Sequence, residues 1–172
     1  SVLLLSQDLN PNEVVHDGCT LLNLAAANSD QTSSLVTQVL LEDDRVDPNI
    51  LNKDLKTPLW VALTSSNSEK TIKLLLESNS LDPNIHYKGQ SYLHFFLDPY
   101  SMIDFQIDNV KEDLKTTTIF EESFVKFAVE RLLKLKGNVM KKSLNDGLTP
   151  LAYGVLKNCN SDVVRMLIEY GA

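Results

Sequence analysis

Hydrophobic residues in the stretch 53–86 recur at the spacing of two short helices, which a polar break separates. One face of a helix is predicted where apolar positions follow i, i+3 and i+4. This spacing occurs twice in the stretch: Leu59, Ala62 and Leu63 in the first helix, and Ile72, Leu75 and Leu76 in the second. Helices this short are unstable alone in water, so each must pack against a neighbour.

Residues that favour helix ends bound the two predicted helices. Thr57 can cap the first helix, and Pro58 then occupies the first helical position, where its missing N–H costs nothing. The residues Ser-Ser-Asn at 65–67 break this helix, and Ser68 can cap the second one. The triplet Asp-Pro-Asn at 82–84 favours a turn. The stretch is therefore predicted to form one helix–turn–helix unit.

The start and the end of this unit recur along the chain. The Thr-Pro-Leu start at Thr57 returns at Thr149 and, in weaker form, at Thr20 and Ser91. Successive starts are 37, 34 and 58 residues apart, and the last interval equals one period plus an insertion. The turn also returns, as Asp-Pro-Asn at 47–49 and as Asn-Pro-Asn at 10–12.

Helix starts of this type at this period are the signature of ankyrin repeats, and the chain resembles that family from end to end apart from the insertion. The resemblance implies an all-α ankyrin-repeat solenoid of stacked helix–turn–helix units, with about four repeats, an N-terminal half repeat and a long insertion in the third full repeat. The alternative is a non-repetitive helical bundle with chance matches. The expected single domain, 1–172, divides into a partial repeat 1–14, repeats 15–50, 51–85 and 86–142 (with the insertion 98–122), and a truncated repeat 143–172.

Several residues depart from the family pattern. Leu55 replaces the turn glycine, and Trp60 replaces the family histidine, which is matched only by His94. The resemblance implies a structural, hydrogen-bonding role for His94 within its repeat. Phe96 occupies a position where the family uses alanine. We expect its ring to splay the third repeat from a neighbour or to force local repacking.

The insertion 98–122 is acidic, but its pattern is not that of a plain linker. Ile103, Phe105 and Ile107 alternate with polar residues, which predicts a strand with one buried face. Two compatible interpretations remain open. The insertion is an ordered excursion that packs on the stack, or it is an interaction element, as long loops between rigid elements often are.

A capping box is predicted at the end of the insertion. Thr118 and Glu121 have the spacing of that motif, in which the side chains of both residues satisfy backbone N–H groups. This motif would start a lengthened second helix that carries Phe120 and Phe124.

Charge and cysteine usage narrow the class of partner. The net charge of −7 argues against nucleic acid and anionic membranes. No stretch resembles a membrane-spanning helix or a signal peptide, so direct membrane insertion is not expected. Cys19 and Cys159 fall in different repeats and are expected to be free thiols in a reducing compartment. The cytoplasm is the expected location, and the nucleus is the alternative.

No residue pattern indicates catalysis, a metal or a cofactor. The chain has no CxxC, no HExxH and no glycine-rich phosphate loop. His16 and Cys19 are close in sequence, but no residue is arranged to orient them as a catalytic pair. We therefore expect a non-enzyme with no catalytic residues, no metal and no cofactor.

The resemblance implies that a protein or peptide partner contacts the turn tips and the exposed ends of the first helices. We expect Trp60 either to contact a partner or to pack against the next repeat. The expected partner-binding residues are Val14, His16, Asp17, Leu51, Lys53, Asp54, Lys56, Trp60, Thr64, Ser65, Tyr87, Lys88, Phe105, Asn145, Asp146, Leu148 and Lys157.

These observations favour a non-catalytic interaction module, such as a scaffold, an adaptor or a substrate-recruiting array. The alternative is an intramolecular regulatory or substrate-selecting segment of a larger enzyme whose catalytic domain lies outside this sequence. Further ankyrin repeats of the same chain are expected to flank both ends, because a stack normally needs polar capping repeats.

Overall fold

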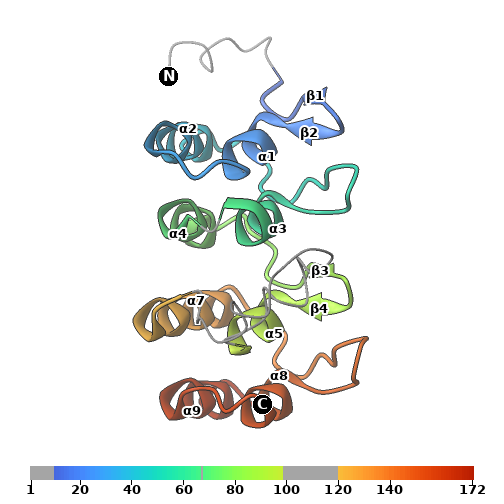
Figure 1. Cartoon of the computed structure of the whole chain (residues 1–172), viewed down its shortest axis with the longest axis vertical. Helices are drawn as coiled ribbons and strands as arrows, with labels where there is room; N and C mark the ends of the chain where they lie inside the picture. Colours follow the sequence, from blue (N-terminus) through green and yellow to red (C-terminus); the bar gives the residue numbers. More distant parts are fainter. Residues whose placement is uncertain (1–9, 67, 99–119) are drawn as a thin grey trace, which may run out of the picture. The chain divides into compact units, whose positions relative to one another are not determined.

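The computed structural model describes residues 10–66, 68–98 and 120–172 (Figure 1). They fall into two compact units, an N-terminal unit over Ser1–Leu81 and a C-terminal unit over Asp82–Ala172. Each unit is built from pairs of antiparallel helices with turns that project from one side, and each is described by itself.

Two helix pairs form the N-terminal unit. The inner helices α1 and α3 pack against each other, and so do the outer helices α2 and α4 (Figure 1). The elements in order are β1 (Val14–His16), β2 (Cys19–Thr20), α1 (Leu21–Ala26), α2 (Gln31–Leu41), α3 (Pro58–Val61), the π-helical turn η2 (Ala62–Ser66) and α4 (Glu69–Glu77).

The predicted helix starts of this unit are confirmed. The Thr57 hydroxyl accepts a hydrogen bond from the Trp60 N–H at 3.2 Å, and the Ser68 hydroxyl accepts one from the Thr71 N–H at 3.4 Å. The predicted break at 65–67 is wrong in position, because η2 continues the helical path to Ser66. There the Thr64 hydroxyl donates to the Trp60 carbonyl at 2.7 Å, a side-chain bond that competes with the backbone hydrogen bonds of the helix.

Helix α2 buries small polar residues. Ser34 and Thr37 face the interior, while Leu35 and Val36 are 50% and 44% exposed. Burial is tolerated because the hydroxyls bond within the helix: Ser34 donates to the Gln31 carbonyl and Thr37 to the Ser33 carbonyl, both at 2.9 Å. One apolar face of this outer helix is thus left exposed.

The C-terminal unit repeats the arrangement of inner and outer helices. Helix α5 contacts α7 and α8, and helix α9 contacts α7 and α8 (Figure 1). The elements are β3 (His86–Tyr87), β4 (Gln90–Ser91), α5 (Tyr92–Leu97), α7 (Glu122–Lys134), α8 (Pro150–Leu156) and α9 (Ser161–Glu169).

The fold is mostly helical, but two turn tips form short antiparallel hairpins that an all-α description omits. β1 pairs with β2, and β3 pairs with β4. The hairpins turn at Asp17-Gly18 and Lys88-Gly89, and all four residues have positive φ. Two consecutive positive φ values are those of the tight turn whose twist matches paired strands, and glycine adopts them at little cost.

The predicted capping box is wrong about where the second helix of the third repeat starts. Helix α7 begins at Glu122, its N-cap Glu121 makes no side-chain capping bond, and Phe120 precedes the helix. Thr118 lies outside the described residues, as does the predicted strand at 103–107.

Phe96 is accommodated by local repacking, which was one of the two expected consequences. Its ring is 3% exposed and lies 5.5 Å from the ring of Phe95, 6.0 Å from that of Phe120 and 6.5 Å from that of Phe124, centre to centre. These spacings are typical of favourable aromatic pairs. An aromatic cluster thus fills the space around a residue where the family uses alanine.

Candidate partner-binding surface

The first two tips of the N-terminal unit pack directly against each other. The Lys53 ammonium lies 2.7 Å from the Asp17 carboxylate, and a Cβ on Gly18 would meet the Lys53 backbone nitrogen at 2.8 Å. The hydrogen bond from Lys53, its charge and that of His16 lower the pKa of Asp17. Because both partners of the ion pair are more than half exposed, it shapes the surface and adds little to stability.

The second tip exposes two leucines. Leu51 is 46% exposed and Leu55 is 67% exposed. Leu55 has a φ of +60°, in the left-handed region that favours glycine. The Asn52 side chain holds this tip by accepting hydrogen bonds from the N–H groups of Asp54 and Lys56, both at 3.0 Å. The tip therefore presents an apolar side chain from a strained backbone position.

Two predicted binding residues of the N-terminal unit are corrected by the structure. Trp60 is fully buried, so its ring packs in the interior and offers no surface to a partner. Its packing against the next repeat stays a prediction. Thr64 is also buried, and its hydroxyl is satisfied there, because it donates to the Trp60 carbonyl and accepts from the Lys56 ammonium at 2.9 Å. Ser65, next in the chain, is exposed.

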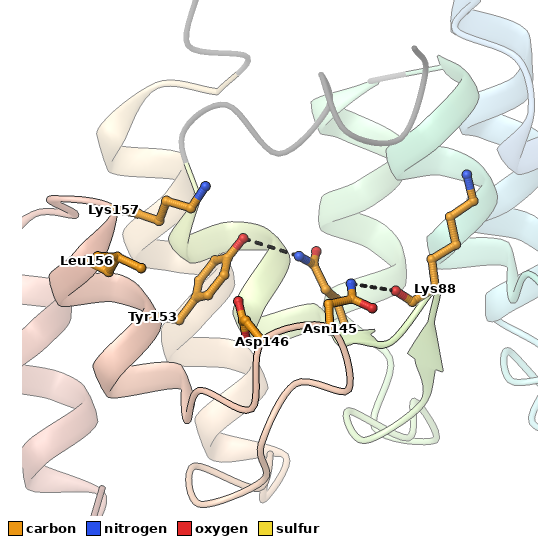
Figure 2. Close-up of a pocket in the computed structure, with 7 residues that line it drawn as sticks. Lys88, Asn145, Asp146, Tyr153, Leu156 and Lys157 are labelled. Atoms are coloured by element: carbon orange, nitrogen blue, oxygen red, sulfur yellow. Dashed lines mark hydrogen bonds between the residues drawn. The ribbon is translucent and has the colours of Figure 1, made fainter. Parts of the chain in front are cut away.

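The C-terminal unit holds a pocket with a volume of about 430 Å³ (Figure 2). In Figure 2, Asp146 lies between Tyr153 and Asn145, and Lys157 and Lys88 stand on opposite flanks. The pocket is lined by Lys88 and Gln90 from the β3–β4 hairpin, Asn145 and Asp146 from the next tip, and Tyr153, Leu156 and Lys157 from and just after helix α8.

A buried polar network fixes the floor of this pocket. The Tyr153 hydroxyl donates to the Asp98 carboxylate at 3.0 Å and accepts from the Gln90 side-chain amide at 3.2 Å. The Lys157 ammonium lies 2.8 Å from the same carboxylate, whose side chain is 1% exposed. Burial, with the nearby charge of Asp98, raises the pKa of Tyr153, so its hydroxyl keeps the proton that it donates.

Two tips of the C-terminal unit are joined by hydrogen bonds at the pocket edge. The Asn145 side chain donates to the Lys88 carbonyl at 2.9 Å, and the Leu144 N–H donates to the Gly89 carbonyl at 2.8 Å. A Cβ on Gly89 would clash with the Asn145 side chain, so this approach requires glycine. The pocket edge is therefore positioned by hydrogen bonds to two backbone carbonyls of the β3–β4 hairpin.

His94 has a structural role, as the resemblance implied, but it bonds to the next repeat and not only within its own. Its Nδ1 lies 2.7 Å from the Ser91 hydroxyl, and its Nε2 lies 3.0 Å from the carbonyl of Leu148, which is just before α8. A carbonyl only accepts, so Nε2 carries the proton and Nδ1 accepts from Ser91. Burial lowers the pKa of His94, which keeps the ring neutral.

The pocket brings together four predicted binding residues: Lys88, Asn145, Asp146 and Lys157. Tyr87 and Leu148 are half-buried outside its lining, and Phe105 lies outside the described residues. The sequence-based prediction missed Tyr153, whose hydroxyl organises the site. The sequence does contain a signal for Tyr153, because it carries a hydroxyl where the equivalent positions of the other repeats hold the apolar residues Leu24, Val61 and Phe95.

Two further features of the described residues bear on function. No group of three or more His, Cys, Asp or Glu side chains among them is placed to hold a metal ion. Within the same part of the chain, every helix is too short or too polar to cross a membrane. Cys19 and Cys159 are both free, and burial raises the pKa of the Cys159 thiol.

The sequence matches the family model described as "Ankyrin repeats (3 copies)" over residues 2–95. No curated protein matches it significantly. Among solved structures, the crystal structure of EF0377, an ankyrin repeat protein, is similar with 16% sequence identity and a TM-score of 0.44; the alignment covers 98% of this chain and 88% of that protein.

Proposed function

The chain belongs to the ankyrin-repeat family, and on this premise we propose that it binds a protein or peptide partner through its turn tips and the exposed ends of its inner helices. Ankyrin repeats are generally protein–protein interaction modules and are typically non-catalytic. Scaffolding, adaptor and substrate-recruiting roles are all specific forms of this function.

The observation that carries the proposal is the exposure of large apolar side chains at the tips. Leu51, Leu55 and Leu144 are 46%, 67% and 79% exposed, whereas the inner-helix leucines Leu59 and Leu93 are buried. Leucines that project beside charged groups give a partner both apolar area to bury and charges that fix its orientation.

The proposed surface keeps the predicted tip residues and omits the two buried ones, Trp60 and Thr64. Phe105 remains a prediction from the sequence. In the described residues, the retained positions are Val14, His16, Asp17, Leu51, Lys53, Asp54, Lys56, Ser65, Tyr87, Lys88, Asn145, Asp146, Leu148 and Lys157.

Site-specific photocrosslinking tests this surface. A photoreactive phenylalanine analogue replaces Leu55 or Leu144 at the tips, and the matched controls carry it at Val36 or Ile168, which are 44% and 56% exposed on outer helices. After irradiation in cell lysate, we expect the tip variants to give a discrete adduct with another polypeptide that the controls lack. Equal labelling at tips and outer helices would contradict the proposal.

The regulatory alternative predicts a different adduct in the same experiment. If the chain is a segment of a larger enzyme, the tips should crosslink within that polypeptide instead of to another protein. We also propose that further repeats of the same chain flank both ends of this sequence. The cytoplasm or nucleus is the proposed location, where the thiols of Cys19 and Cys159 stay reduced.

A further inference from the structure

The C-terminal unit holds a second pocket, with a volume of about 350 Å³, which we call the helix-end pocket. Its lining residues come from the end of α5, the start of α7 and the connection between α8 and α9. The turn tips precede α5 and α8, so this pocket lies at the other end of the inner helices. It is therefore a site separate from the tip surface.

The lining of the helix-end pocket changes from apolar to acidic toward solvent. Phe96 and Phe120 are buried, and Val125 is half-buried. Glu121 and Glu122 are exposed, so the pocket is open to solvent on their side. A ligand that enters there meets carboxylates first and apolar side chains behind them.

The two carboxylates have no counter-ion. Among the residues that the structure describes, no ion pair or capping bond engages the side chain of Glu121 or Glu122. Lys126, one turn along α7 from Glu122, pairs with Asp162 at 2.9 Å, and Lys157, just after α8, pairs with a buried carboxylate at 2.8 Å. Acidic residues favour the first turn of a helix in any case, so the carboxylates alone indicate no ligand. Beside an apolar pocket with no cation in its lining, they leave an uncompensated negative charge.

The remaining polar groups of the lining are neutral. Burial raises the pKa of the Cys159 thiol, so this side chain is protonated near neutral pH and adds no charge. An acidic ligand is repelled by the two carboxylates, and an aliphatic one leaves them unpaired. A long basic side chain has both of the required parts, an apolar methylene stem and a cationic end with N–H donors.

We propose that the helix-end pocket binds the side chain of an arginine or lysine in a peptide partner. The stem packs against Val125 and Phe120, and the cationic group lies against the carboxylates of Glu121 and Glu122. The proposal goes beyond the tip surface, because it adds a contact at the opposite end of the inner helices. A partner that reaches both sites gains avidity, since the second contact forms within the same complex.

A random peptide library displayed on phage tests the preference for a basic residue. The whole chain is the bait, and parallel selections use two double variants. The pocket variant combines Glu121→Gln with Glu122→Gln, and the control variant combines Glu69→Gln with Glu169→Gln. We expect peptides with a fixed arginine or lysine from the wild type and the control variant, and loss of that preference with the pocket variant.

The control variant matches the pocket variant in charge and in helix position. Each removes two exposed carboxylates, and Glu69 lies in the first turn of α4 as Glu122 does in that of α7. Only Glu121 and Glu122 line the pocket. The match is needed because the net charge of −7 attracts basic peptides to the chain as a whole.

A binding cycle then assigns the charge contact. The best selected peptide is compared by fluorescence anisotropy with an analogue in which citrulline replaces the arginine, or acetyllysine the lysine, so that the stem stays and the charge is lost. We expect the analogue to bind roughly fivefold more weakly to the wild type and the control variant, and this difference to disappear with the pocket variant. Added salt should reduce the difference, because the carboxylates are exposed.

Cys159 reports where the peptide binds. Its thiol lines the helix-end pocket, whereas Cys19 lies in the N-terminal unit. Both are labelled on the wild type with methyl methanethiosulfonate and followed by mass spectrometry. We expect the peptide to slow the labelling of Cys159 and to leave that of Cys19 unchanged. Circular dichroism establishes that each variant is folded, and this labelling decides the pocket if the pocket variant is not.

The outcomes separate this proposal from the function of the tips. A fixed residue of another class, equal recovery of basic peptides by both variants, unchanged labelling of Cys159 or the absence of any selected peptide would overturn the pocket assignment. A peptide that binds only after residues 99–119 are replaced by a Gly-Ser link would also overturn it, because the chain itself would then occupy the pocket. None of these results bears on the tip surface, which the photocrosslinks at Leu55 and Leu144 test independently.

Discussion

The two units tie their neighbouring repeats together in different ways. In the N-terminal unit, the tips are joined by the exposed ion pair between Lys53 and Asp17, with the Gly18 backbone against Lys53. In the C-terminal unit, the ring of His94 and the hydroxyl of Tyr153 make buried hydrogen bonds from one repeat to the next. Exposed ion pairs contribute little to stability, whereas losing one partner of a buried bond is costly.

Equivalent positions show how the difference arises. Lys56 in the N-terminal unit reaches Thr64 within its own repeat. Gln90, at the position of Lys56, and Asp98, at that of Thr64, instead meet at Tyr153 of the following repeat. Lysine and threonine at these two positions thus make a contact within one repeat, whereas glutamine and aspartate make a bridge between two. The C-terminal unit therefore has two repeats that are coupled by buried hydrogen bonds, and a preformed polar pocket.

The largest effect is expected for His94→Ala. This change leaves the Leu148 carbonyl and the Ser91 hydroxyl without their partner and opens a cavity, so we expect a loss of about 2–4 kcal/mol in the free energy of unfolding. Chemical denaturation measures the loss, and hydrogen exchange should show weakened protection on both sides of the contact, in α5 and α8.

Asn23→Ala is the matched control, because Asn23 is the equivalent residue of the first repeat and bonds only to its own helix cap at Thr20. Its exchange effect should stay within α1. If His94→Ala also loosened α5 alone, the idea that His94 couples two repeats would fail.

The His94→Ala variant also tests how the stability of the chain depends on pH. Burial lowers the pKa of His94 in the folded state, so the unfolded chain binds the proton more tightly. Stability from this source is present above the ordinary histidine pKa of about 6.5 and is lost as the pH falls below it. The wild type should lose more stability between neutral pH and pH 5 than His94→Ala. The smaller loss expected to remain comes from His86, whose pKa burial and Lys141 also lower.

Tyr153→Phe should have the next largest effect. It removes one hydroxyl and leaves both the Asp98 carboxylate and the Gln90 amide short of a partner, at a cost of about 1–3 kcal/mol. The comparison is Lys56→Met, which removes the partner of Thr64 in the N-terminal unit, where the Thr64 hydroxyl keeps its bond to Trp60. Equal losses in the two variants would remove the distinction between the units.

Leu55→Gly should change stability in the opposite direction. Leu55 has a φ of +60°, whereas Gly18, Gly89 and Gly147 fill the equivalent positions of the other repeats. Relief of the left-handed conformation should stabilise the chain by roughly 1 kcal/mol, while the exposed apolar side chain is lost. Thermal unfolding measures the gain, and Leu51→Gly, at a position without positive φ, should show none.

The helix starts could be predicted from the sequence because their causes are local. Thr57 and Ser68 cap helices through bonds that span three residues, and a short motif carries that information. The Thr118–Glu121 motif predicts the start of α7 wrongly, because the helix begins at Glu122 without a side-chain cap. A local motif permits a capping bond but does not ensure it.

The pocket could be predicted only in part, because some of the residues that form it are far apart in the sequence. Lys88 and Asp146 were expected at tips because their repeat positions are regular. The bond from Tyr153 to Asp98 joins residues 55 positions apart across the insertion, and no spacing rule relates them. The burial of Trp60 depends on how its ring packs against other side chains of the folded chain, and the repeat pattern does not determine that packing.

The smallest effect is expected for Lys53→Met, which breaks the tip ion pair of the N-terminal unit. Both charged groups are exposed, so their attraction is weakened by water and screened by salt. The thermal midpoint should hardly move, and 1 M sodium chloride should remove what difference there is. Lys157→Met is the counterpart in the C-terminal unit, where the Asp98 side chain is 1% exposed. That variant should lose stability at low and high salt alike, because salt does not reach a buried carboxylate that has lost its cation.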